Sequence, residues 1–170
     1  MAFLLKLADR ADAFNRALGR ASGWAVFLLV LAEFSIVVLS GNFQEGSIKL
    51  QESVLYLNSL VFLGAAGYAL LTDAHVRVDI FYRGLSERAQ AKVNLVGTLA
   101  FLLPFLAFLW SIAVPFVAAS WRNLEGSFET SGLPLVFVLK SFILLFALTL
   151  TVQGFSLAVR ALATLRPGSS

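Results

Sequence analysis

Four long apolar runs alternate with shorter polar segments along the chain. They cover residues 23–41, 54–72, 93–120 and 133–159. A hydrocarbon core about 30 Å thick needs roughly 20 helical residues to cross it, and backbone groups cannot remain unpaired in lipid. The alternation of apolar and polar residues that is typical of membrane β-barrels is absent. The pattern therefore predicts an all-α integral membrane protein with four transmembrane helices, at about residues 23–41, 54–72, 86–120 and 133–163.

The third predicted helix has a recognisable start and two possible bends. Ser86 is a good N-cap and Glu87 suits a first helical turn, so we expect this helix to begin before the apolar run does. Pro104 and Pro115 lie inside the run and are expected to bend the helix. The third and fourth runs exceed one crossing, so these helices should tilt or project beyond the lipid.

Residues 1–22 follow a different pattern from the rest of the chain. Apolar residues recur there at spacings of three and four, at Leu4, Leu7, Ala11, Phe14 and Leu18. Most of the charged residues of this segment occupy other faces, which predicts an amphipathic helix lying in the inner interface of the membrane. A signal peptide is the alternative, but the charged region is long and no small-residue cleavage site follows. Residues 23–164 then form a single transmembrane domain, and residues 165–170 form a tail.

Positive charges alternate between the segments that flank the predicted helices. Taken from the N-terminus, the five flanking segments carry 4, 1, 4, 1 and 2 Lys or Arg residues. Because cytoplasmic loops are enriched in Lys and Arg, this alternation predicts that both termini are cytoplasmic. The two opposite loops are acidic and contain Glu45, Glu52, Glu125 and Glu129.

Composition narrows the possible chemistry. Hydrophobic residues make up 59% of the 170 residues and charged residues only 14%, which is typical of a membrane protein. The net charge of +3 is too small to indicate nucleic-acid binding. The chain contains no cysteine, which excludes disulfides, thiolate metal sites and a cysteine nucleophile.

Residues 73–83 concentrate charge between the second and third apolar runs. This segment holds the single histidine, His75, with Asp73, Arg77 and Asp79 nearby. A metal site or a haem site would need further ligands, and catalysis would need a second reactive group. We predict no catalytic residue, no metal ligand and no cofactor here. A solvated loop whose arginines set topology and contact anionic lipid and a contact with another protein both remain open.

Several motifs in this order resemble a known family of transporter subunits. The run from Gly64 to Asp79 ends in a His-x-Arg-Val-Asp pattern, and Glu52 stands near the start of the second helix. The loop after the third helix carries Glu125 and Ser127, followed by Gly132, Leu133 and Pro134. Over about residues 20–160 the chain resembles the small membrane subunit, DctQ-like, of tripartite ATP-independent periplasmic (TRAP) transporters.

The resemblance implies a non-catalytic accessory role in the inner membrane of a bacterium. A periplasmic substrate-binding protein (P subunit) would deliver an organic anion, often a carboxylate. A large membrane subunit (M subunit) would hold the substrate and sodium sites, and the small subunit would brace its immobile scaffold. The resemblance also assigns a structural or partner-contact role to Glu52, Asp73, His75, Arg77, Asp79, Glu125, Ser127 and Pro134.

Two charged residues interrupt the apolar runs and raise a separate question. Glu33 lies in the first run and Lys140 in the fourth, each at an expected depth of roughly 10–12 Å below the outer surface. An ionisable residue at this depth is a functional candidate, and opposite charges at equal depth suggest one buried pair. The alternative is that each contacts the large subunit or the interface separately. An autonomous transporter or channel would instead favour several charges along one helix face.

Overall fold

A computed structural model describes residues 1–42, 46–74, 82 and 84–166 of the chain. The described helices are α1 (Ala2–Asn42), α2 (Ile48–Gly64), α3 (Ala66–Leu71), α5 (Glu87–Gly97), the π-helical turn η1 (Thr98–Leu102), α6 (Leu103–Arg122) and α7 (Val136–Leu165). Four continuous helical segments among them are long and apolar enough to cross a membrane. The predicted all-α fold with four spanning helices is confirmed.

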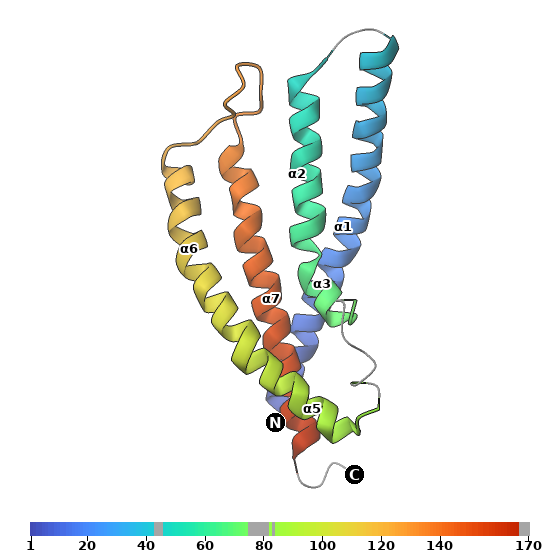
Figure 1. The fold of residues 1–170 in the computed structure, drawn as a ribbon, viewed down its shortest axis with the longest axis vertical. Coiled ribbons are helices and arrows are strands. Elements are labelled where there is room, and N and C mark those ends of the chain that lie inside the picture. Colours follow the sequence, from blue (N-terminus) through green and yellow to red (C-terminus); the bar gives the residue numbers. More distant parts are fainter. Residues whose placement is uncertain (43–45, 75–81, 83, 167–170) are drawn as a thin grey trace.

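The four segments run up and down between two ends (Figure 1). The start of α1 and the end of α7 lie at one end, which we call the terminal end. The end of α1, the start of α2 and residues 123–135 lie at the other, which we call the loop end. Figure 1 shows α1 beside α2 and α6 beside α7, and α7 contacts every other helical segment. Helix α7 is therefore the centre of the bundle.

The sequence suggested a separate helix at residues 1–22, but these residues do not form an element of their own. They are the first half of α1, which continues without a break to Asn42 and is about 60 Å long at ~1.5 Å per residue. The amphipathic prediction counted Asp12 among the charged residues on the other faces, whereas Asp12 and Asn15 are buried in the protein. Their contacts with α7, described below, hold this half in line with the spanning half.

The other helix boundaries follow local signals. Ser86 is the N-cap of α5 and accepts a hydrogen bond from the Ala89 N–H at 3.4 Å, as predicted. The helix that was expected from residue 54 already begins at Ile48, where Ser47 forms the N-cap. The turn η1 ends just before Pro104, the second residue of α6. Proline has no N–H to donate to the preceding turn, so a wider π turn is a natural junction there.

The packed core lies near the middle of the bundle, and buried residues of α6 continue from it toward the loop end as far as Ser120. Ala66, Leu106 and Leu150 form its centre, and Leu70, Leu102, Trp110 and Phe146 pack against them. In the loop half, no described residue of α1 beyond Ala25 is buried, and α2 buries only Gly64, at its last position. Helix α1 also diverges from α7 toward this end (Figure 1). Large apolar residues such as Phe34, Phe62 and Phe108 remain exposed, as expected for lipid or a partner chain.

Candidate functional site

A buried polar network joins α1 to α7 at the terminal end. We call it the terminal network; its members are Asp12, Asn15, Gln153, Ser156 and Arg160. Ser156 Oγ and Gln153 Nε2 donate to Asp12 Oδ1 at 2.6 and 3.1 Å. Asn15 Nδ2 donates to Gln153 Oε1 at 2.9 Å and to a main-chain carbonyl of α7 at 3.2 Å. Polar groups removed from water must be paired, so these bonds hold α1 to α7 in one register.

Arg160 balances the charge of the terminal network. Its guanidinium donates to Asp12 Oδ2 and to Asp9 Oδ1, both at 2.7 Å. The two carboxylates differ in environment, since the Asp12 side chain is 5% exposed and that of Asp9 is 66% exposed. A buried carboxylate depends on its partners far more than an exposed one. We therefore expect the bond to Asp12 to contribute more to the free energy of folding than the bond to Asp9.

The terminal network was not predicted from the sequence, although the sequence contains a signal for it. Asp12 and Asn15 are three residues apart, and Gln153, Ser156 and Arg160 follow at spacings of three and four. Such spacings place polar side chains on one face of a helix. Two polar faces on apolar helices are candidates for contact with each other.

At the loop end, Glu52 of α2 binds residues 123–135. Its carboxylate accepts a hydrogen bond from Ser127 Oγ and a second from the Leu133 N–H at 2.5 Å. The Ser127 N–H in turn donates to the Leu133 carbonyl at 3.2 Å, and Pro134 lies against Gly126. The structure thus brings together four residues that the resemblance had singled out: Glu52, Glu125, Ser127 and Pro134.

Lys140 forms its ion pair with Glu125 and not with Glu33, which corrects the expected pairing. Lys140 Nζ lies 2.5 Å from Glu125 Oε2 and 4.3 Å from the centre of the Phe116 ring. Helix α7 begins only at Val136, so Lys140 is its fifth residue and lies beside the loop that carries Glu125. Glu33 is exposed on α1.

The Lys140 contact lowers the pKa of Glu125 from its usual value, chiefly through the hydrogen bond that Lys140 donates. Because the pKa of Glu125 is lower in the folded protein, the ion pair stabilises the fold fully when the pH is above the ordinary carboxyl pKa. This stabilisation is lost as the pH falls through the lowered value. The loop end should therefore loosen only under acidic conditions.

The charged segment at residues 73–83 is only partly described. His75, Arg77 and Asp79 lie outside the described residues, so their predicted role stays a prediction. Asp73 is described and follows α3 with a φ of 57°. This left-handed conformation ends the helix, and the Ala74 N–H donates back to the Ala69 carbonyl at 2.9 Å. Among the described residues no group of three or more His, Asp or Glu gathers as a metal site would.

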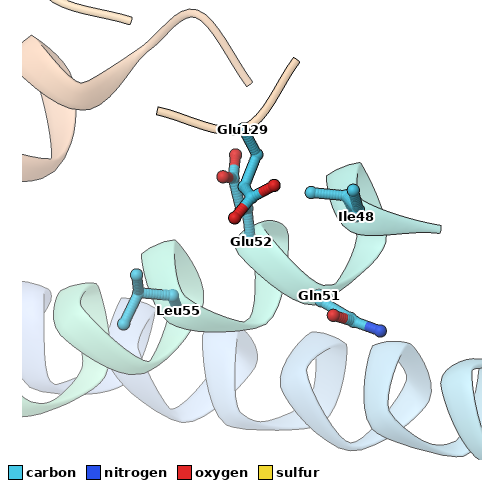
Figure 2. Close-up of a pocket in the computed structure, with 5 residues that line it drawn as sticks. All are labelled: Ile48, Gln51, Glu52, Leu55 and Glu129. Carbon is cyan, nitrogen blue, oxygen red and sulfur yellow. The ribbon is translucent and has the colours of Figure 1, made fainter. Parts of the chain in front are cut away.

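An open pocket of about 350 Å³ lies beside Glu52 at the loop end. Ile48, Gln51 and Leu55 of α2 line it together with Glu52, and Glu129 reaches it from residues 123–135 (Figure 2). The two glutamates differ in their bonds. The Glu52 carboxylate holds the loop. The Glu129 carboxylate makes no hydrogen bond to any described residue, although the backbone N–H of Glu129 donates to Ser127 Oγ at 3.0 Å.

Glu52→Gln should release residues 123–135 from α2. The variant loses a charged acceptor of two hydrogen bonds, so we expect the Leu133 amide to exchange its hydrogen about tenfold faster. Hydrogen exchange read by mass spectrometry on the protein in nanodiscs measures this rate. Glu129→Gln is the matched control and should leave the rate unchanged, because it alters the same pocket without removing a bond. Equal exchange in both variants would show that Glu52 does not hold the loop.

The fold defines a small multi-pass α-helical membrane protein, most of whose polar contacts gather at the two ends of the bundle. A family model described as "Tripartite ATP-independent periplasmic transporters, DctQ component" matches residues 43–165. This match covers well over half of the chain, which therefore belongs to the DctQ family and is a small membrane component of a TRAP transporter. Comparison with curated proteins and with solved structures finds no match.

The family match confirms the resemblance seen in the sequence. It includes Glu52, Glu125, Ser127, Pro134 and Lys140, all of which take part in the contacts of the loop end. The matched region begins at residue 43, after the end of α1. The α1 half of the terminal network therefore lies outside the matched region, and the α7 half lies within it.

Proposed function

We propose that this chain braces the immobile scaffold of the large membrane subunit of a TRAP transporter. The transporter would take up an organic anion, a carboxylate, with sodium, after a periplasmic binding protein has delivered the anion. The substrate and sodium sites would lie in the large subunit, and this chain would add no catalytic or cofactor chemistry. In this proposal the protein lies in the bacterial inner membrane with both termini cytoplasmic, consistent with the distribution of Lys and Arg.

One observation carries the bracing role: most of the described polar contacts between helical segments lie at the two ends of the bundle, and between them Trp110 Nε1 of α6 donates to Thr151 Oγ1 of α7 at 3.1 Å. The terminal network ties α1 to α7, and Glu52 ties α2 to residues 123–135. Between these ends the bundle exposes large apolar side chains. A substrate path would need polar groups along its length, and Glu33 is the one charged residue described in the loop half of α1. A bundle tied at its ends with an apolar exterior suits a rigid support.

The charged segment at residues 73–83 is proposed as a docking contact on the cytoplasmic side. His75, Arg77 and Asp79 place charges of both signs in a short segment between two helices. Such a segment can pair with carboxylates or helix termini of another subunit. Because the proposed orientation puts it opposite the face where substrate arrives, we assign it to assembly and not to transport.

Uptake by reconstituted proteoliposomes tests the proposed function. The large subunit with this chain, the cognate binding protein and an inward sodium gradient should accumulate the labelled anion. The large subunit alone should accumulate far less, and this chain alone none. Equal uptake by the large subunit alone would overturn the bracing role. Uptake by this chain alone would instead support an autonomous transporter.

A further inference from the structure

The loop half of α1 exposes a regular seam of residues that no described part of the chain buries. The seam contains Gly23, Val26, Val30, Glu33, Val37 and Ser40, and all six are exposed. Their spacings alternate between three and four, the pattern of a helix face that packs along a second helix. The bulkier Trp24, Phe27 and Leu31 fall on other faces of α1.

The seam continues a face of α1 that is already an interface. Glu33 follows Asn15 by 18 residues, which is about five helical turns, so the two side chains project in nearly the same direction. Asn15 and Ala8 are fully buried and contact α7, and Ser22 on the same face is buried beside Gly64 of α2. In the loop half α1 has diverged from α7 (Figure 1), and the same face is left uncovered.

Glu33 makes this uncovered face energetically unfavourable in lipid. It lies roughly 13 Å from the end of α1 at ~1.5 Å per residue, with valines before and after it in the seam. A carboxylate at such a depth requires a partner or a proton. Its former candidate partner, Lys140, is bonded to Glu125. The partner must therefore come from another molecule if the carboxylate is to stay charged.

We propose that the seam around Glu33 seats a transmembrane helix of the large subunit, and that a Lys or Arg of this helix pairs with the Glu33 carboxylate. Valine suits such a contact because its stiff side chain loses little freedom on packing. A second copy of this chain fits less well, because a symmetric dimer through the seam would bring two Glu33 carboxylates together. This inference rests on the proposed association with the large subunit and adds the face and chemistry of the contact.

Site-directed cross-linking tests the face. The chain has no cysteine, so Val30→Cys and Val37→Cys can each carry a benzophenone maleimide in the complex with the large subunit. Illumination in nanodiscs should join these positions to the large subunit. Leu31→Cys and Trp24→Cys are the controls on other faces and should join to it several-fold less. Cross-links that are no stronger at the seam, or that join two copies of this chain, would overturn the proposal.

Charge reversal tests the chemistry. We expect Glu33→Lys to lower the amount of large subunit that co-purifies with this chain on the order of tenfold, and Glu33→Gln to lower it several-fold. Leu31→Lys adds the same charge on another face and should have a smaller effect. Changing the cross-linked cation of the large subunit to Glu should restore assembly with Glu33→Lys.

The outcomes distinguish failure of the proposed function from failure of the Glu33 ion pair. If the unmodified chain retains no large subunit, both the proposed function and the seam are wrong. If it does, and Glu33→Lys and Leu31→Lys lose equal amounts, the function stands and the ion pair is wrong. Unchanged assembly of Glu33→Gln in nanodiscs would mean that Glu33 is protonated in lipid or bonded by a neutral donor, which likewise overturns the ion pair.

Discussion

Asp12→Ala should lower the free energy of unfolding by about 3–5 kcal/mol, the usual cost of removing one partner of a buried ion pair. The variant leaves the donors of Gln153, Ser156 and Arg160 without their shared acceptor. Because Arg160 is partly exposed and can regain water, we expect the lower end of this range. Thermal unfolding in nanodiscs, followed by tryptophan fluorescence, measures the loss.

Asp9→Ala provides the matched control for Asp12. Asp9 also accepts a bond from Arg160, at the same 2.7 Å, but its side chain is largely exposed. An exposed pair contributes about 0–1 kcal/mol, so this variant should remain close to the unmodified protein. Limited proteolysis adds a second readout, since release of α1 from α7 should expose the first half of α1 in Asp12→Ala only. Equal stability of the two variants would refute the role of burial.

Gly67→Ala should destabilise the protein by about 1–3 kcal/mol through overpacking. A Cβ added at Gly67 would lie 2.7 Å from Asn15 Cγ and 2.8 Å from Thr149 Cβ. The Asn15 amide is held by its hydrogen bonds, and Thr149 Cβ is attached directly to the backbone of α7, so neither can move aside cheaply. This glycine allows α3 to approach both α1 and α7 closely.

Gly64→Ala, three residues earlier, should not destabilise the protein. An added Cβ there would meet its nearest atoms, on Leu145 and Ser22, at 3.5 Å, which is ordinary van der Waals contact. Alanine is favoured over glycine inside a helix by roughly 0.5–1 kcal/mol, so this variant should be neutral or more stable. Thermal unfolding of both variants under identical conditions tests the contrast. A similar loss in both would mean that the close approach at Gly67 is not specific.

The membrane-spanning architecture could be predicted because crossing lipid requires only a sufficient length of consecutive apolar residues. A run of about 20 apolar residues is the length that crosses the hydrocarbon core, and the chain contains four such runs. Local chemistry also sufficed for Ser86, whose capping hydrogen bond joins residues only three positions apart. The motif around Glu52, Ser127 and Pro134 was recognised through its resemblance, without any indication of which atoms meet.

Pairings between distant residues required the tertiary structure. Asn15 and Gln153 are 138 positions apart in the sequence. The hydropathy pattern shows that each residue is polar, but it does not show that their helices are in contact. The same limit explains the wrong partner for Lys140, whose depth was inferred from the end of an apolar run. The start of α7 at Val136 and the path of the preceding loop bring Lys140 to Glu125. A sequence pattern thus reports the cost of placing a residue in lipid, whereas the packing of the helices decides which polar groups satisfy one another.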